Sequence, residues 1–353
     1  MNRNYGWMPV AATLALGVMG MGHVAGAQTS TQITTGATEN QQADAQSGPE
    51  DISANVPNAG PDSRNWRLVP ALSDEFNGSG LDASKWDDAP QSWGIWTWSA
   101  DNVSVENGAL ALRMRPDDQP NAVIRDSNYK TSTKHTYFSS GIIQSKANQV
   151  YGYYEARVKG VDTFPGSAPA FWLYSNLKTD QAAGFVGKAD GDPAYSEVDI
   201  VEMQQHPDDA RIMDLHAPYQ VIRNGKPTWI RNAQQAPYLD HKNVKVDFDP
   251  AAAFHTYGVM VAPDRLTWYI DGKEVNSLPN TNWNRLPMNV TLSLGLREPN
   301  MRYGTKDKPC PGKAWRCAVA PKVNADGSVD GYPAKMLVDW VRVYAKKPGT
   351  GAF

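Results

Sequence analysis

The feature that most constrains this chain is a series of short segments in which apolar and polar residues alternate, separated by Gly, Pro, Asn and Asp. No amphipathic helix of convincing length is found after Trp66. Alternation with a period of two is typical of strands that bury one face. The sequence therefore predicts an all-β domain, with strands over Ala109–Arg113, Tyr151–Lys159, Glu197–Val201, His255–Val261, Leu266–Ile270 and Met336–Tyr344.

Glycine-containing turns connect several of these segments. Asn107-Gly108 separates VSVE from ALALR, and Asp271-Gly272 separates LTWYI from KEV. Both dipeptides favour the tight turns that join antiparallel strands. No internal repeat is visible, which disfavours a propeller. We therefore predict two packed, curved antiparallel sheets, and the concave face of such a sandwich can serve as a cleft for a polymer chain.

The first 27 residues have the features of an export signal. Arg3 precedes an apolar run over Met8–Gly22, and an A-x-A cleavage motif ends at Ala27. The alternative is a membrane anchor, but a spanning helix needs about 20 apolar residues and this run is shorter. We predict a signal peptide over residues 1–27, no membrane anchor, and a secreted or periplasmic protein.

The segment after the signal differs in composition from the rest of the chain. Residues 28–63 are rich in Gln, Thr, Ser, Asn, Ala and Pro and contain no aromatic residue. Such a sequence cannot bury enough apolar surface to form a core. We predict a disordered polar tether over residues 28–63, a folded domain over 64–346 and a short tail over 347–353.

Composition excludes several classes of protein. The 34 basic and 37 acidic residues give a net charge of −3, which excludes a broadly basic nucleic-acid binder. Two cysteines exclude a disulfide-built scaffold and a Cys-rich zinc site, and six histidines show no H-E-x-x-H pattern. In an exported protein, Cys310 and Cys317 are a candidate disulfide around the turn at Pro311-Gly312, with free thiols as the alternative.

Three acidic residues interrupt an apolar segment, SEVDIVEM, which covers Ser196–Met203. In a regular strand Glu197 and Asp199 point to the same face, because side chains alternate. Glu202 is five positions after Glu197 and would point to the opposite face, but one β-bulge returns it to the shared face. We therefore predict that all three carboxyl groups line one face of the sheet.

Clustered carboxyl groups can perform acid–base chemistry. The backbone positions of the two glutamates would lie about 13 Å apart. If their side chains lean toward each other, the distance between the two carboxyl groups can fall to the roughly 5–5.5 Å of a retaining glycoside hydrolase. An inverting pair is held about 6.5–9.5 Å apart. Repulsion couples the titration of the acids and helps to keep one protonated. The alternative is a strand face on which the acids are merely exposed to solvent. The third acid and the preceding Phe171-Trp172 favour a catalytic site instead.

The segment SEVDIVEMQQ resembles the E-x-D-x-x-E signature of glycoside hydrolase family 16. SDEFNGSGLDASKW, YGYYEARVKG, PAFWLY and MLVDWVRVY resemble other strands of that family, so the resemblance covers most of residues 66–344. YFSSGIIQSKANQVYGYYEARVKG, TFPGSAPAFWLYSN and YSEVDIVEMQQ are most similar to the κ-carrageenase branch and its relatives that cleave furcellaran and β-carrageenan. The family fold is a β-jelly roll, which agrees with the strand pattern.

The resemblance also implies a role for each acid. Glu197 matches the nucleophile that forms a glycosyl-enzyme intermediate, and Glu202 matches the general acid/base. Asp199 matches the assisting carboxylate that hydrogen-bonds the nucleophile.

Aromatic residues are expected to bind sugar faces. By resemblance, Trp172 forms the cleft floor near the cleaved sugar; the alternative is burial in its apolar run. Trp96 and Trp98 would share one face of an extended segment, and the resemblance favours Trp98 for stacking on a sugar. The alternative for this pair is packing at the edge of the sandwich.

Basic residues indicate an anionic substrate. Trp229 and Arg231 lie two residues apart, so a strand would aim a ring and a guanidinium to one side, which suits a sulfated sugar. The alternative for this pair is an exposed loop whose long side chains extend into solvent. By resemblance, Arg297 contacts sulfate, with an ion pair to Glu298 as the alternative. By resemblance, His216 matches a histidine near the cleaved bond, with a structural role as the alternative. We therefore expect all four residues to bind substrate.

No cofactor is expected for catalysis, but a structural metal is considered. Many family members bind Ca²⁺ on the convex face, and the resemblance implies Asp339 and the backbone near Gly108 as ligands. Oxygen ligands of that kind suit Ca²⁺.

These features predict a secreted, monomeric, endo-acting retaining hydrolase that cleaves β-1,4 linkages in sulfated red-algal galactans of the κ-carrageenan, furcellaran or β-carrageenan type. The alternative is a β-agarase or porphyranase of the same family. A β-1,3-glucanase and a non-catalytic carbohydrate-binding protein are more distant alternatives. The partner would be an anionic galactan, with no nucleic acid.

Overall fold

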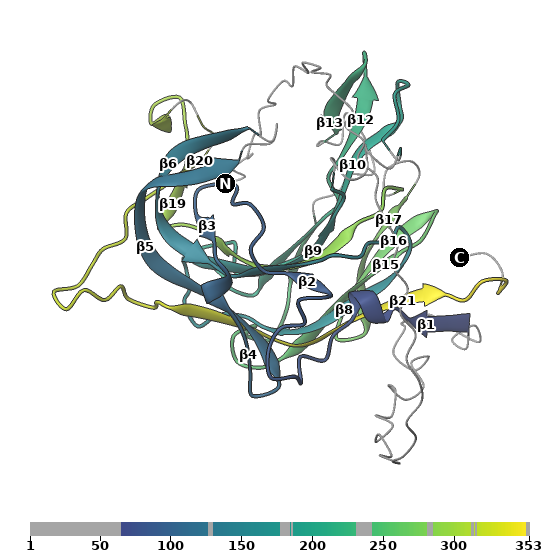
Figure 1. The fold of residues 1–353 in the computed structure, drawn as a ribbon, viewed down its shortest axis with the longest axis horizontal. Helices are drawn as coiled ribbons and strands as arrows, with labels where there is room; N and C mark the ends of the chain where they lie inside the picture. Colours follow the sequence, from purple (N-terminus) through teal and green to yellow (C-terminus); the bar gives the residue numbers. More distant parts are fainter. Residues whose placement is uncertain are drawn as a thin grey trace, which may run out of the picture.

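The protein consists almost entirely of β-strands in two large sheets (Figure 1). The computed structural model describes residues 65–125, 130–176, 184, 186–230, 242–280, 285–311, 314 and 316–350. Two short 3-10 turns lie entirely within these residues, η3 (Pro70–Leu72) and η4 (Ala100–Asn102). The predicted all-β sandwich is confirmed.

The larger sheet has ten strands, and its central strands pair antiparallel. Its path is β17 (Lys273–Pro279), β16 (Arg265–Ile270), β15 (His255–Val261), β8 (Gly152–Lys159), β21 (Ala334–Lys346), β5 (Ala109–Arg125), β6 (Thr131–Ser140) and β3 (Thr97–Trp98), with β1 (Trp66–Leu68) on β21 and β4 (Val103–Glu106) on β5. The β1–β21 pair joins the first and last strands, which closes the domain.

The second sheet has nine strands and carries the acidic segment. Its path is β13 (Lys226–Ile230), β12 (Tyr219–Arg223), β10 (Pro193–Glu202), β9 (Ser167–Tyr174), β18 (Asn289–Leu296), β7 (Ile142–Ser145) and β2 (Trp86–Asp87), with β11 (Ile212–His216) between β10 and β14 (Lys242–Lys245). Strands β19 (Met301–Tyr303) and β20 (Arg316–Ala318) form a separate pair.

Alternation along each strand separates the core from the outer face of the second sheet. In β18, the sequence NVTLSLGL sends Val290, Leu292 and Leu294 into the core between the sheets, where each is fully buried. Burying such a side chain stabilises the fold by about 1.5–3 kcal/mol. The intervening Thr291 and Ser293 therefore lie on the opposite face of the strand, and that face carries the site.

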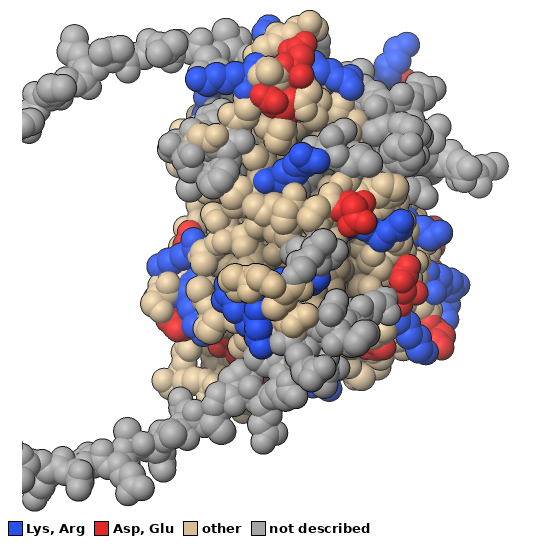
Figure 2. Space-filling view, turned by 90° about the vertical axis from the view of Figure 1, so that its right-hand side faces the viewer, with Lys and Arg blue, Asp and Glu red and all other residues tan. Residues whose placement is uncertain are grey.

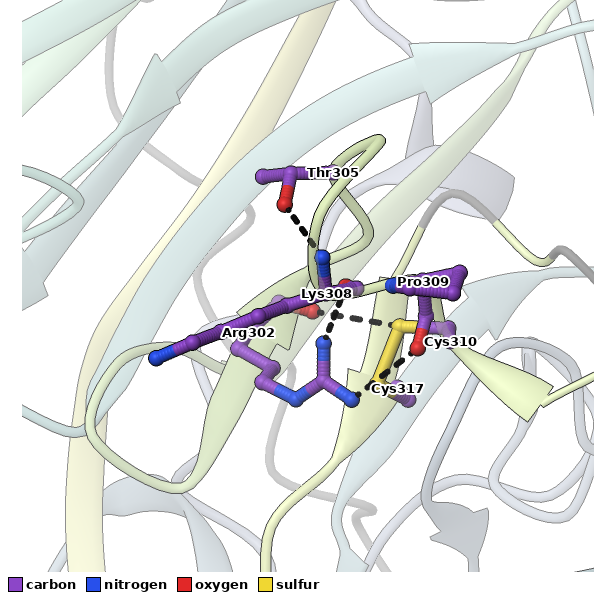
Figure 3. Close-up of a disulfide and its surroundings, with 6 residues drawn as sticks. All are labelled: Arg302, Thr305, Lys308, Pro309, Cys310 and Cys317. Atoms are coloured by element: carbon purple, nitrogen blue, oxygen red, sulfur yellow. Dashed lines mark hydrogen bonds between the residues drawn. A yellow bond between two sulfur atoms is a disulfide. The ribbon is translucent and has the colours of Figure 1, made fainter.

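The cysteine pair forms the predicted disulfide. Cys310 and Cys317 are bonded, with their Cα atoms 5.6 Å apart. Arg302 reinforces the loop, because its guanidinium donates to the carbonyl oxygens of Lys308 at 2.8 Å and Pro309 at 3.3 Å (Figure 3). The loop is therefore held both covalently and by hydrogen bonds.

The surface charges agree with the small net charge. On the face that Figure 2 shows, basic and acidic residues are intermixed rather than gathered into one basic region. In the part of the chain that the structure describes, no helix is long and apolar enough to cross a membrane. The predicted signal peptide and tether lie outside the described residues.

A buried carboxyl group makes the stability of the larger sheet depend on pH. Glu155 on β8 is 6% exposed, and burial raises its pKa from 4.5 to about 7, although the Tyr153 hydroxyl donates to it at 2.8 Å. Because the folded-state pKa exceeds the unfolded one, the folded protein holds a proton that the unfolded chain releases. This contribution to stability is full below pH 4.5 and is lost as pH rises through about 7.

We predict that Glu155→Gln is more favourable to stability at pH 8 than at pH 5, by about 1–3 kcal/mol, because the amide has no proton to lose. Urea unfolding at both pH values measures the difference. Glu274→Gln, at an exposed position on β17 of the same sheet, is the control. An equal effect of Glu155→Gln at both pH values would contradict the prediction.

Candidate active site

A β-bulge in β10 determines how the acidic segment is presented. Asp199 lies opposite Trp172 on β9, and Val201 lies opposite the preceding residue, Phe171. Two steps along β10 therefore correspond to one step along β9, and Ile200 is the extra residue. The register confirms the bulge that the sequence predicts.

The bulge brings the three acids onto one face. Their partners on β9 are Tyr174 for Glu197, Trp172 for Asp199 and Ala170 for Glu202. These three partners alternate with Phe171 and Leu173, which are fully buried in the core. Directly paired residues share a face of the sheet. All three carboxyl groups therefore lie on the face opposite the core.

A row of paired residues crosses the sheet at Asp199. Trp172 pairs with Asp199 on one side and with Thr291 on the other, while His216 pairs with Asp199 from β11. The Nδ1 atom of His216 is 3.9 Å from Oδ2 of Asp199. The structure therefore brings His216, Asp199 and Trp172 together, as a shared site requires.

Trp172 is fixed in the floor of this face. Its Nε1 donates to Oγ of Ser293 at 3.1 Å, and its ring stacks on Tyr174 with centroids 4.7 Å apart and planes inclined by 19°. The side chain is only partly buried, so part of the ring is accessible. Tyr174 was not identified from the sequence, although its spacing of two from Trp172 indicates the same face.

Glu197 accepts a short hydrogen bond from a tyrosine on its own strand. The hydroxyl of Tyr195 donates to Oε2 of Glu197 at 2.6 Å, and Trp229 on β13 packs edge-on against the Tyr195 ring at 5.2 Å. Desolvation and the adjacent Glu197 charge raise the pKa of Tyr195 well above its usual value, so it stays a neutral donor. Tyr195 was missed in the sequence, where it precedes Glu197 by two positions.

Glu202 is paired with an arginine that lies 95 residues later in the sequence. Nη2 of Arg297 donates to Oε1 of Glu202 at 3.0 Å, and Nε of Arg297 donates to Oε1 of Gln205 at 2.5 Å. The carboxylate partner of Arg297 is thus a candidate catalytic residue rather than the neighbouring Glu298. Gln205 was not identified from the sequence.

An aromatic cluster lies beside this floor. Trp98 packs edge-on against Trp93 and Trp96, each with ring centroids 5.4 Å away, and Trp93 packs against Tyr174 at 6.4 Å. Trp98 is 8% exposed and belongs to the hydrophobic core cluster. The contacts connect Trp98 to the floor, and its role in stacking on a sugar stays a prediction.

A polar pocket extends the floor toward β2. Gln144 on β7 pairs with Thr291 on one side and with Asp87 on the other, so the row through Asp199 and Trp172 continues to the edge of the sheet. The pocket is lined by Asp87, Gln144, Ser145, Lys146, Asn148, Asn176 and Asn289. Its side chains offer hydrogen-bonding groups of the kind that bind sugar hydroxyls.

Three predicted positions need separate mention. Arg231 lies outside the described residues. Asp339 lies in β21, where it forms an ion pair with Arg157 on β8, and Gly108 lies at the β4–β5 turn with φ of 75°. The described residues contain no group of three or more His, Cys, Asp and Glu that could hold a metal. Because Arg157 already supplies positive charge to Asp339, this arrangement does not favour Ca²⁺, and a calcium site stays a prediction.

Comparisons with known proteins show which family the chain belongs to. A family model of the GH16 domain of beta-porphyranases A–D matches residues 66–346. The kappa-carrageenase of Pseudoalteromonas carrageenovora is 38% identical over 283 residues, which are 80% of this chain and 65% of that protein. Beta-porphyranase B of Zobellia galactanivorans is 28% identical over 219 residues, 59% of this chain and 67% of that protein.

Solved structures give the same result. The P. carrageenovora kappa-carrageenase in complex with an oligotetrasaccharide of kappa-carrageenan superimposes with a TM-score of 0.66 at 37% identity, covering 80% of this chain and 95% of that one. The kappa-carrageenase from Z. galactanivorans gives 0.64 at 34% identity, covering 80% and 96%. The chain belongs to glycoside hydrolase family 16, as its motifs predict, and it has that family's β-jelly-roll fold.

We predict that Tyr195→Phe lowers kcat/KM by about tenfold to a hundredfold, because Glu197 loses a hydrogen bond that is typically worth about 1.5–3 kcal/mol when one partner is charged. Initial rates of reducing-end release measure the loss. Tyr137→Phe, on β6, is the control variant. Unchanged kinetics in Tyr195→Phe would show that the hydroxyl does not support Glu197.

Proposed function

We propose that this protein is a secreted, endo-acting, retaining glycoside hydrolase that cleaves β-1,4 linkages in sulfated red-algal galactans of the κ-carrageenan type. The observation that carries the proposal is the bulged strand, which puts Glu197, Asp199 and Glu202 on one accessible face beside Trp172 and Arg297. The identity to the P. carrageenovora kappa-carrageenase over 80% of this chain supports the substrate class.

In the proposed first step, a carboxylate oxygen of Glu197 attacks the anomeric carbon of the sugar. The bond to the leaving oxygen breaks as Glu202 donates a proton to it, which releases the chain on that side as an alcohol. The product is an ester between the sugar and Glu197. Asp199 lies between Trp172 and His216 in the row of paired residues. In this step it orients the nucleophile and helps to set its protonation.

In the second step, Glu202 acts as a base. It removes a proton from water, whose oxygen attacks the anomeric carbon and breaks the ester to Glu197. Both glutamates return to their starting protonation. Because each step inverts the anomeric carbon, the product keeps the β configuration.

The choice between galactans rests on charge. Arg297 beside Glu202 suits a sulfated sugar, since a guanidinium offers two donors in the geometry that an oxyanion accepts. A porphyranase is the second candidate, because the family model that matches residues 66–346 describes beta-porphyranases. Reducing-sugar assays across κ-carrageenan, furcellaran, porphyran, agarose and laminarin, with product sizing, distinguish these substrates and an endo from an exo action.

We predict that Glu197→Gln lowers turnover by about 10⁴-fold or more while fold and substrate binding are retained, because the amide keeps the shape but cannot form the ester. Turnover is measured on the galactan that the wild type degrades, and circular dichroism checks the fold. Activity within tenfold of the wild type would remove Glu197 from the mechanism.

The stereochemical prediction follows from the two-step pathway. NMR of fresh product is expected to show the β-anomer first, before mutarotation. Initial appearance of the α-anomer would indicate that Glu197 and Glu202 act as an inverting pair. The spectra of product formed by Tyr195→Phe, which keeps both glutamates, serve as the internal comparison.

A further inference from the structure

The polar pocket toward β2 contains buried polar atoms that form no hydrogen bond within the part of the chain that the structure describes. These atoms are Nε2 of Gln144 on β7 and, on β18, Oδ1 of Asn289 and Oγ1 of Thr291. Gln144 is 9% exposed, Asn289 is 7% exposed and Thr291 is fully buried. A buried polar atom without a partner is unfavourable to folding. Three such atoms at neighbouring positions therefore indicate a place where a ligand supplies the missing bonds.

Strand pairing places these three side chains on the same face as the acids of β10. Gln144 lies directly opposite Thr291, and Asn289 precedes Thr291 by two residues. Diagonal neighbours of this kind have Cα atoms about 7–8 Å apart, within reach of long side chains. Asn289 also lies opposite Tyr174, which in turn lies opposite Glu197. At about 4.8 Å per strand, β18 is about 10 Å and β7 about 14 Å from β10, so the pocket faces a sugar beyond the one at the cleaved bond.

The hydrogen bonds of Asn289 fix which way its amide points. Its Nδ2 donates to the carbonyl oxygens of Ser145 at 2.8 Å and Ala147 at 3.1 Å. These two bonds match the two amide hydrogens, so the oxygen and the nitrogen cannot exchange places without losing them. Asn289 and Gln144 both line the pocket. Asn289 therefore contributes an acceptor there, while Nε2 of Gln144 contributes donors.

The charged groups of the pocket do not favour an anion inside it. Asp87 on β2 lies directly opposite Gln144 and brings a carboxylate to the lining. Lys146 also lines the pocket, but its ammonium donates to the carbonyl oxygen of Ala83 at 2.6 Å. A sulfate ester would meet the Asp87 carboxylate and the oxygen of Asn289, and it has no hydrogen to donate to either. The pocket therefore suits a neutral group that both donates and accepts.

We propose that this pocket binds a free hydroxyl of the sugar chain and rejects a sulfate ester at that position. The proposal deepens the proposed function and rests on it. A hydroxyl can donate to Oδ1 of Asn289 while it accepts from Nε2 of Gln144. The stacked rings of Trp172 and Tyr174 on β9 lie between the acids and the pocket, and they offer a platform for the intervening sugar. The protein would thus select a galactan by where sulfate is absent.

The first test measures binding in the Glu197→Gln background, where turnover is prevented. Calorimetry with κ-carrageenan oligosaccharides of increasing length gives the affinity gained as the chain reaches the pocket. We expect Gln144→Leu to reduce that gain about threefold to tenfold, the effect of one lost neutral hydrogen bond. Asn276→Leu is the control, because Asn276 also has a buried amide nitrogen without a partner among the described residues, but on β17 of the larger sheet. An undiminished gain in Gln144→Leu would overturn the proposal.

Protein stability separates ligand binding from a structural role of the same atoms. Leu is similar in size to Gln and removes a buried amide that lacks a partner, so Gln144→Leu should be at least as stable as the wild type in thermal unfolding. Thr291→Val removes one buried hydroxyl with little change in shape, and it should also weaken binding of the longer oligosaccharides. It carries the binding test if Gln144→Leu does not fold. Lower stability with unchanged binding would show that these atoms serve the fold, and would overturn the proposal.

The rejection of sulfate is tested with chemically oversulfated κ-carrageenan oligosaccharides of the same lengths. We expect Glu197→Gln protein to lose the gain in affinity on lengthening, because the added sulfate meets the Asp87 carboxylate. Asp87→Asn should restore part of the gain, since the amide keeps the shape without the charge. Equal gains for ordinary and oversulfated chains would overturn the proposal. If the wild type cleaves only an unsulfated galactan, the proposed function fails separately, and oligosaccharides of that galactan then decide whether the pocket binds a hydroxyl.

Discussion

The site depends on one irregularity, the extra residue Ile200 in β10. Without it Glu202 would point into the core, where an ionised carboxyl group is too costly to bury. With it, Val198 and Val201 both fill the core while Glu197, Asp199 and Glu202 share the opposite face. The bulge therefore satisfies packing and presents three acids at the same time.

The two glutamates then differ through their neighbours. Glu197 accepts a hydrogen bond from the neutral hydroxyl of Tyr195, whereas Glu202 is ion-paired with Arg297. Two carboxyl groups in different surroundings can take different roles in one reaction, which is the arrangement that acid–base catalysis by paired acids needs. The partners come from different elements, so each environment is set independently.

The same alternation that builds the core also builds the floor of the cleft. On β18 the apolar residues Val290, Leu292 and Leu294 fill the space between the sheets, and Thr291 and Ser293 support Trp172 from the other face. A change that shifted the register of β18 by one residue would exchange these two sets. Stability of the sandwich and geometry of the site are therefore coupled.

Much of the fold and part of the site could be predicted from the sequence. The alternation of apolar and polar residues, the turn residues and the need for a bulge between Glu197 and Glu202 are all local features of the chain. They gave the all-β sandwich, the shared face of Glu197 and Glu202, and the short disulfide loop. Tyr195 could also have been found, since it precedes Glu197 by two positions. The partner of Glu202 could not, because Arg297 is 95 residues away. Only strand order and sheet packing decide which distant charges meet, because pairing between strands is not encoded in the spacing within any one of them.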